Sequence, residues 1–232
     1  MNILSIDTTA DICSVALLVG DERYAFHEYR PREHAKILLP EIHRLLAKAQ
    51  MLAADLDSIV FGRGPGSFTG VRIATGVAQG LAYSANCSVI SVSTLQSLAF
   101  TAAQTGAQDI WVALDARMSE VYFCRYLVNS QGIPMSVCDE IVTAPDSLPV
   151  DFSERTAFIG NGWLAGYPLN SAFEGRDFTE FEKTSLPNAM DSALLAQRLL
   201  DHSLTEPLLP EKAIPTYLRD NVTWTQKPKI GS

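Results

Sequence analysis

The sequence predicts an α/β fold of two lobes, each built on a mixed sheet that is flanked by helices. In the first half, apolar runs of strand length alternate with helical patterns in the order β-β-β-α-β-α-β-α, which is typical of sheets covered by helices. The second half repeats the opening: residues 110–115, like residues 3–7, form an apolar run that ends in an aspartate and precedes another apolar run. This repeat predicts an N-terminal lobe of residues 1–106 and a smaller C-terminal lobe of residues 107–232.

The first 49 residues predict a β-meander followed by a helix. Three short apolar runs, residues 3–6, 14–19 and 24–29, are joined by turns, as in an antiparallel meander. Apolar residues then recur at helical spacing between Leu38 and Ala49. Pro40 falls inside this pattern and predicts either a kink there or a helix start close to it.

The next helix, residues 70–86, is rich in small residues and follows a strand at residues 58–62. Gly70, Ala74, Ala78 and Ala82 repeat every fourth residue, and Gly76 and Gly80 have the same spacing. A glycine inside a helix costs about 0.5–1 kcal/mol relative to alanine, so these residues indicate close packing. Either the helix packs on its own sheet, or its face around Ile73, Gly76, Val77 and Gly80 contacts another chain.

Beyond residue 86, strand and helix patterns continue to alternate at first and then become less regular. Residues 89–92 predict a strand, and Thr94 is expected to cap a helix that ends near residue 105. Later strands are expected at residues 110–115, 120–128 and 157–160, with a helix at residues 191–202. The tail from residue 206 is rich in proline and is expected to lie along the folded body. It contains a small basic cluster of Arg219, Lys227 and Lys229.

The loop between residues 62 and 70 contains four glycines and one proline, which is more turn chemistry than a plain connection needs. Backbone N–H groups at the start of a helix favour anions, so Gly64, Gly66 and Ser67 are candidates for an anion site. The loop has no Walker pattern, because no lysine occurs between Lys48 and Lys183. The alternative is a tight turn in which Ser67 or Thr69 caps the helix.

Asp7 and Asp115 each end a predicted strand and could face one another across a cleft. Together they could hold a hydrated Mg²⁺ against phosphates, with Thr8 beside the first aspartate. The alternative is that each carboxylate closes a tight turn. The candidate nucleotide or anion site comprises Asp7, Thr8, Gly64, Gly66, Ser67 and Asp115.

Composition excludes several classes of protein. The formal charge of −8 argues against a main nucleic-acid binder. The spacings of the four cysteines and four histidines are not those of a metal site, and Cys13 has no histidine near it in sequence to make it a nucleophile. The N-terminus does not resemble a signal peptide, and no apolar run has the length of a membrane helix. We therefore expect a cytoplasmic protein with reduced thiols and no membrane partner.

Several stretches together resemble one known family, and the similarity covers nearly the whole chain. They are residues 3–19, Pro31-Arg32-Glu33-His34, residues 62–73, Ser93-Thr94-Leu95, residues 115–122 and Tyr217-Leu218-Arg219. These stretches are similar to the TsaB (YeaZ) family, bacterial proteins of the threonylcarbamoyladenosine modification of tRNA. The resemblance implies the two-lobed actin-like ATPase (ASKHA, ribonuclease H-like) fold.

The resemblance also implies a subunit without catalytic residues or a metal. The family's active paralogue, TsaD, carries a metal-binding histidine pair on the helix after the next strand, but residues 93–99 here contain no histidine. The resemblance therefore implies a non-catalytic scaffold or activator subunit. The alternative is an enzyme in its own right, either a weak stand-alone ATPase or a metallopeptidase-like glycoprotease.

The implied partners are the catalytic TsaD paralogue and a TsaE-type P-loop ATPase, with a homodimer when the chain is alone. tRNA is expected to be reached only indirectly, through the complex. The family's heterodimer joins the first two helices of each N-terminal lobe, here residues 34–49 and 70–86. The predicted partner-binding residues are Leu38, Glu41, Leu45, Arg72, Ile73, Gly76, Val77 and Gly80. No tightly bound cofactor is expected, although ATP or ADP could bind at the subunit junction.

Overall fold

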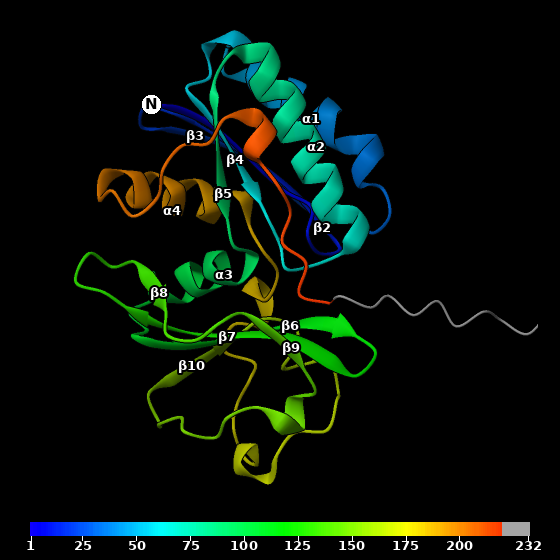
Figure 1. Ribbon diagram of the computed structural model, residues 1–232, viewed down its shortest axis with the longest axis vertical. Coiled ribbons are helices and arrows are strands. Elements are labelled where there is room, and N and C mark those ends of the chain that lie inside the picture. The colour runs from blue at the N-terminus through cyan, green and yellow to red at the C-terminus, as the bar shows by residue number, and fades with distance from the viewer. Residues whose placement is uncertain (220–232) are drawn as a thin grey trace, which may run out of the picture.

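Two five-stranded sheets, one above the other, form the frame of the molecule (Figure 1). The computed structural model describes residues 1–219, apart from the side chain of Lys183. Lys227 and Lys229 of the predicted basic cluster therefore lie outside the described residues. The α/β prediction, with two mixed sheets flanked by helices, is confirmed.

The first sheet has the strand order β3-β2-β1-β4-β5. Its strands are β1 (Asn2–Asp7), β2 (Ile12–Val19), β3 (Glu22–Tyr29), β4 (Ser58–Gly62) and β5 (Ser88–Val92). The first three strands are antiparallel neighbours, which confirms the predicted meander, and β4 and β5 run parallel to β1. Parallel strands need a crossover connection, and helices supply it between β3 and β4 and between β4 and β5.

Both faces of the first sheet are covered because its strands are apolar on both sides. α1 (His34–Lys48) and α2 (Phe68–Ala85) lie side by side on one face, against residues such as Leu4 and Ile59. α4 (Ala189–Asp201) covers the other face, where Ile3 and Val60 point. α1 begins six residues before Pro40, so the alternative that this helix starts near the proline is wrong.

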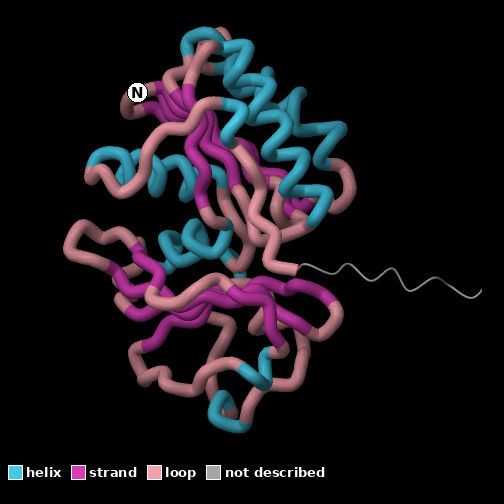
Figure 2. The backbone as a smooth tube through the Cα atoms, in the orientation of Figure 1, coloured by secondary structure: helices cyan, strands magenta, loops and turns pink. Residues whose placement is uncertain are grey.

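The second sheet has the order β10-β6-β7-β8, with β9 also paired to β7. Its strands are β6 (Asp109–Arg117), β7 (Glu120–Val128), β8 (Pro134–Ser136), β9 (Ile141–Thr143) and β10 (Thr156–Ile159). α3 (Thr94–Ala103) packs on one face of this sheet, and Trp111, Phe158 and Trp163 form an aromatic cluster on the other. The tube in Figure 2 shows that mainly loops surround this aromatic face.

The remaining helical segments are single 3₁₀ turns. They are η1 (Ala53–Asp55), η2 (Pro145–Ser147), η3 (Ser171–Phe173), η4 (Glu182–Thr184) and η5 (Pro210–Lys212). Ser93, not Thr94, caps α3, because its side chain accepts a hydrogen bond from the Gln96 N–H, and this helix ends at Ala103. Within the described part of the chain, no helix combines the length and apolar character needed to cross a membrane.

The chain passes between the two sheets more than once. α3 packs against β6 and β7 of the second sheet, whereas α4 packs against β1, β2, β4 and β5 of the first. After α4, Leu208 pairs with Val89 at the edge strand of the first sheet. The predicted lobe boundary at residue 106 stays a prediction, since packing on each sheet draws on both sides of it.

Candidate functional site

The glycine loop between β4 and α2 is closed tightly onto the turn that follows β1. The Ser67 N–H donates to the Thr9 carbonyl oxygen at 2.7 Å, and the Thr8 hydroxyl donates to the Gly70 carbonyl oxygen at 2.7 Å. A Cβ atom at Gly66 would overlap the Thr9 carbonyl oxygen, and one at Gly70 would overlap that of Thr8. Glycine is therefore required here by close approach of two backbone segments within the chain.

Ser67 caps α2, as the turn alternative predicted. Its hydroxyl accepts a hydrogen bond from the Gly70 N–H at 3.2 Å, while its own N–H is used by Thr9. Gly64 lies near the start of the loop, and its carbonyl oxygen accepts a hydrogen bond from the Thr94 N–H at 3.1 Å. Both Ser67 backbone and side chain are thus engaged within the protein, which leaves this loop less free to cradle an anion.

Asp7 and Asp115 close turns in the same way, one in each sheet. The Asp7 carboxylate accepts from the N–H of Thr9 at 2.8 Å, and the Asp115 carboxylate accepts from the N–H of Arg117 at 2.8 Å. Each is therefore bonded to the backbone two residues on, the contact that the turn alternative predicted. The shared geometry supports a related plan for the two strand pairs.

The surroundings of the two aspartates differ. Asp7 is almost fully buried, and desolvation raises its pKa to about 6 despite the hydrogen bonds from Thr9. Asp115 is half-buried, and its carboxylate forms an ion pair with the Arg117 guanidinium at 2.9 Å and accepts from the Tyr167 hydroxyl at 2.7 Å. The described residues also contain no group of three or more side chains suited to hold a metal ion.

A cavity of about 340 Å³ lies where the glycine loop, the turn after β1, the β6–β7 turn and the C-terminal strap meet. We define the strap as residues 213–219. Of the six predicted nucleotide or anion residues, Gly66, Ser67 and Asp115 line this cavity, whereas Asp7, Thr8 and Gly64 do not. Arg117 spans the cavity rim, since its guanidinium also pairs with Asp11 at 3.1 Å. Acidic and basic groups thus neutralise one another at this rim.

The predicted partner-binding residues divide into core and surface. Leu38 and Leu45 are each 1% exposed and belong to the core between α1 and the first sheet, so their prediction as contact residues is corrected. An apolar stripe on a helix packs on the protein's own sheet first, and these two leucines form that stripe. Glu41 is half-buried and pairs with Arg44, and Ile73 and Val77 are half-buried against the same core.

The outer face of α2 keeps the other predicted residues. Arg72, Gly76 and Gly80 are exposed, and a Cβ atom at either glycine would meet nothing within 4 Å. Ala74, Ala78 and Ala82, in contrast, are buried against the sheet. The packing alternative is therefore confirmed for the three alanines, whereas contact of the exposed face with another chain stays a prediction.

Sequence reasoning missed an aromatic pair around Arg72. Its guanidinium carbon lies 3.3 Å from the centroid of the Phe68 ring and 4.9 Å from that of Tyr217. The strap carries Tyr217 there, because the Thr216 N–H donates to the Arg63 carbonyl oxygen at 2.7 Å and Arg219 pairs with Glu120. Phe68 and Tyr217 are 56% and 43% exposed. An exposed phenylalanine beside an arginine was the available signal, but only the fold brings Tyr217 beside them.

The chain matches a family model, named relatives from bacteria and a solved structure. A family described as "TsaD: tRNA N6-adenosine threonylcarbamoyltransferase" matches residues 28–227. The chain is 38% identical to the tRNA threonylcarbamoyladenosine biosynthesis protein TsaB of Escherichia coli (strain K12), over 98% of this chain and 99% of that one. It is 35% identical to TsaB of Haemophilus influenzae, over 98% of each chain. The solved structure of YeaZ from Pseudomonas aeruginosa superposes with a TM-score of 0.79 at 35% identity, covering 94% of this chain and 99% of that one.

Proposed function

Because the chain belongs to the TsaB family, we propose that it serves the biosynthesis of threonylcarbamoyladenosine in tRNA as a non-catalytic subunit. In this proposal it binds a catalytic TsaD-type paralogue through the outer face of α1 and α2. Relatives named as tRNA threonylcarbamoyladenosine biosynthesis proteins match it from end to end, which supports the role in the pathway.

The observation that carries the proposal is the exposed glycine pair, Gly76 and Gly80. Neither glycine is needed by the chain's own packing, since both Cβ positions face open space. Two glycines in mid-helix together cost roughly 1–2 kcal/mol relative to alanine. A partner helix can approach the α2 backbone closely only where α2 has no side chains, as at these two glycines. The pair therefore supports a helix–helix contact at this face.

The neighbouring Phe68–Arg72–Tyr217 stack supports the same face. Binding energy at protein interfaces concentrates in aromatic residues and arginine. Here the two rings hold the Arg72 guanidinium one helical turn away from Gly76. Because the three side chains already pack together, they lose little conformational freedom on binding. The proposed contact face is thus Phe68, Arg72, Gly76, Gly80 and Tyr217. Exposed α1 residues such as Leu39 extend it.

The surroundings of Asp115 and Cys13 support a subunit that does no chemistry of its own. The Asp115 carboxylate is already paired with Arg117, and burial raises the pKa of the Cys13 thiol to about 12, which disfavours the reactive thiolate. In the proposal a TsaE-type P-loop ATPase completes the complex in the cytoplasm, ATP or ADP binds at the subunit junction, and tRNA is reached through the partner. A second copy of this chain occupies the same face when the partner is absent.

The test is a bulky substitution on the outer face of α2. Gly76→Leu should weaken association with the TsaD-type partner at least tenfold, because the side chain would separate the two helices. Asp201→Leu is the matched control, since it adds the same exposed leucine to α4 on the opposite side of the sheet. Association is measured by titration calorimetry, and unfolding midpoints show that both variants are folded. Equal affinity of both variants and the unaltered chain would remove the interface assignment.

The alternative is a weak stand-alone ATPase, and the cavity of about 340 Å³ is the observation that favours it. Titration of the isolated chain with Mg-ATP separates the two functions. The scaffold proposal expects no turnover without the partner. Phosphate release by the isolated chain, lost in a variant that blocks the cavity such as Ala116→Trp, would favour the enzyme instead.

A further inference from the structure

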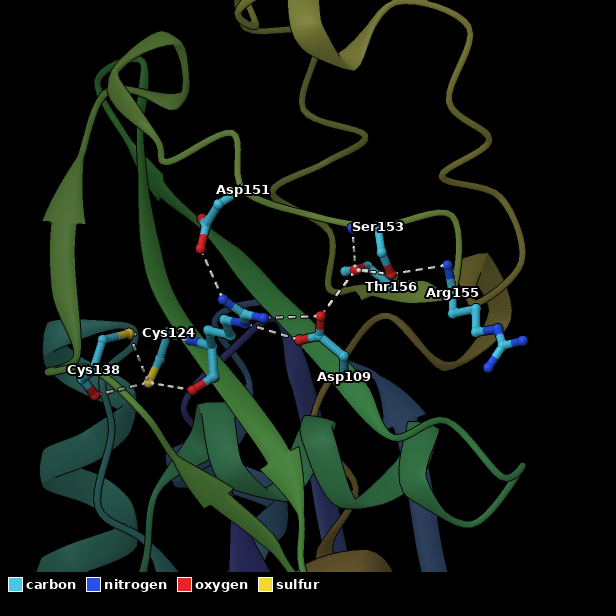
Figure 3. Close-up of polar contacts among 8 residues, drawn as sticks. Asp109, Cys124, Cys138, Asp151, Ser153, Arg155 and Thr156 are labelled. Carbon is cyan, nitrogen blue, oxygen red and sulfur yellow. Dashed lines mark hydrogen bonds and ion pairs between the residues drawn. The ribbon is translucent and has the colours of Figure 1, made fainter.

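Two cysteines of the second sheet lie opposite one another (Figure 3). Cys124 is in the middle of β7 and Cys138 follows β8, and their sulfur atoms are 3.8 Å apart. β7 and β8 pair Tyr126 with Ser136, and the Val137 N–H donates to the Arg125 carbonyl oxygen, so the chain just beyond β8 brings Cys138 beside Cys124. A disulfide joins sulfur atoms about 2 Å apart, so these two sulfur atoms need to approach one another by less than about 2 Å.

The contacts of the two thiols already hold them together. The Arg125 N–H donates to the Cys138 sulfur at 3.3 Å, which places that sulfur over β7. The Cys124 thiol donates to the Cys138 carbonyl oxygen at 3.4 Å. Little movement is therefore needed to bring the two sulfur atoms into bonding distance.

The two thiols differ in access to solvent. Cys138 is exposed, whereas Cys124 is fully buried, and burial raises the pKa of the Cys124 thiol well above its usual range. A small oxidant can therefore reach Cys138 directly, whereas the buried Cys124 thiol reacts afterwards, with the Cys138 sulfur. This order, an accessible thiol backed by a second thiol within reach, is the arrangement found in reversible redox sites.

We propose that Cys124 and Cys138 form a reversible disulfide by exchange with a small-molecule disulfide. The Cys138 thiolate attacks one sulfur of the oxidant, which forms a mixed disulfide and releases one thiolate. The Cys124 sulfur then attacks the Cys138 sulfur, gives up its proton, and displaces the second thiolate. Two protein thiols lose two protons and two electrons, and the oxidant is reduced to two thiols.

The bond would restrain a segment that joins the two sheets. Two residues after Cys138, the Glu140 carboxylate accepts from the Ser93 hydroxyl and pairs with the Arg63 guanidinium at 3.3 Å. Arg63 belongs to the glycine loop and Ser93 caps α3. Oxidation would therefore fix Glu140 to β7 and tighten its hold on the glycine loop.

The test uses the full chain, reduced and then incubated with excess glutathione disulfide, with intact-mass analysis and peptide mapping. We expect a mass loss of two hydrogens and a linked peptide pair containing Cys124 and Cys138, both reversed by dithiothreitol. Cys124→Ser should instead retain one glutathione on Cys138, because the second thiol is missing. Cys87, half-buried just before β5, is the internal control and should take a glutathione adduct at most.

The unaltered chain carries the decisive readout, so a folding defect in the variant does not affect the conclusion. A stable glutathione adduct on Cys138 of the unaltered chain would overturn the proposal, because Cys124 would then have failed to displace it. Absence of any reaction at Cys138 would overturn it as well, since the first step requires this thiol to be reachable.

Discussion

Asp7 is buried at the end of β1 with one carboxylate oxygen bonded to Thr9 and the other without a hydrogen-bond partner among the described residues. Desolvation raises its pKa from 3.8 to about 6. In the folded chain this group therefore holds a proton that the unfolded chain has lost between these two pH values. Its contribution to the free energy of unfolding is highest below pH 4 and falls as pH rises through about 6.

Asp7→Asn should remove this pH dependence. The amide oxygen can still accept from the Thr9 N–H, and no charge has to be buried at neutral pH. We expect the difference in unfolding free energy between variant and unaltered chain to shift in favour of the variant by about 2 kcal/mol between pH 4 and pH 7. Urea unfolding at a series of pH values measures it. A difference that stays constant across this range would show that Asp7 titrates normally.

At the scale of single residues, contacts within a turn could be predicted from the sequence, but contacts that depend on the fold could not. Both aspartates were correctly assigned the alternative of closing a turn, because that contact is local in sequence. The lack of a partner for one Asp7 oxygen among the described residues is a result of burial, which the sequence does not show. The ion pair between Arg117 and Asp115 depends on the geometry of the neighbouring turn. Leu38 and Leu45 were wrongly placed at a partner surface, since a helical pattern shows which residues share a face but not what covers that face.

The α2 helix carries two kinds of glycine, and they should respond oppositely to the same substitution. Gly70→Ala places a methyl group on the Thr8 carbonyl oxygen, so we expect a loss of about 1–3 kcal/mol in unfolding free energy. Gly80→Ala meets nothing within 4 Å and should gain about 0.5–1 kcal/mol through better helix propensity. Urea unfolding of the isolated chain measures both. A loss at Gly80 would show that this glycine serves the chain's own fold rather than an outer contact.

At the scale of elements, strongly periodic segments were predicted well and short ones were not. The strands of the first sheet and the four α-helices within residues 1–219 lie where apolar spacing put them, within a few residues. β8 and β9 have three residues each, too few for a period to be recognised, and they are held by pairing with β7. The course of the strap over α2 likewise follows from contacts with Arg63 and Glu120, which are distant in sequence.

The whole molecule depends on segments that cross between its sheets. Repetition of the strand–aspartate pattern predicted two related sheets, and both exist. That the last helix would return to the first sheet could not be read from the sequence, because α4 has an ordinary apolar stripe that could cover either sheet. α4 packs on the first sheet because Ala193, Leu195 and Leu199 fit against Ile3, Val60 and Ile90.

This arrangement predicts that the N-terminal lobe does not fold alone. A fragment of residues 1–106 would lack α4 and expose the apolar face around Ile3, Leu18, Val60, Ile90 and Val92. It would also leave the inner face of α3 without the second sheet, on which Leu95 and Leu98 pack. Because an exposed apolar patch of this kind favours association, we expect the fragment to aggregate or to lack a cooperative unfolding transition.

Joint expression with residues 107–232 should restore a soluble pair, since the missing helix and sheet are then supplied in trans. Size-exclusion chromatography and thermal unfolding monitored by circular dichroism check both outcomes. A soluble fragment with a cooperative transition would mean that α4 covers a face that is stable without it. Residue 106 would then be a boundary between independent folding units rather than a point between two sheets that stabilise each other.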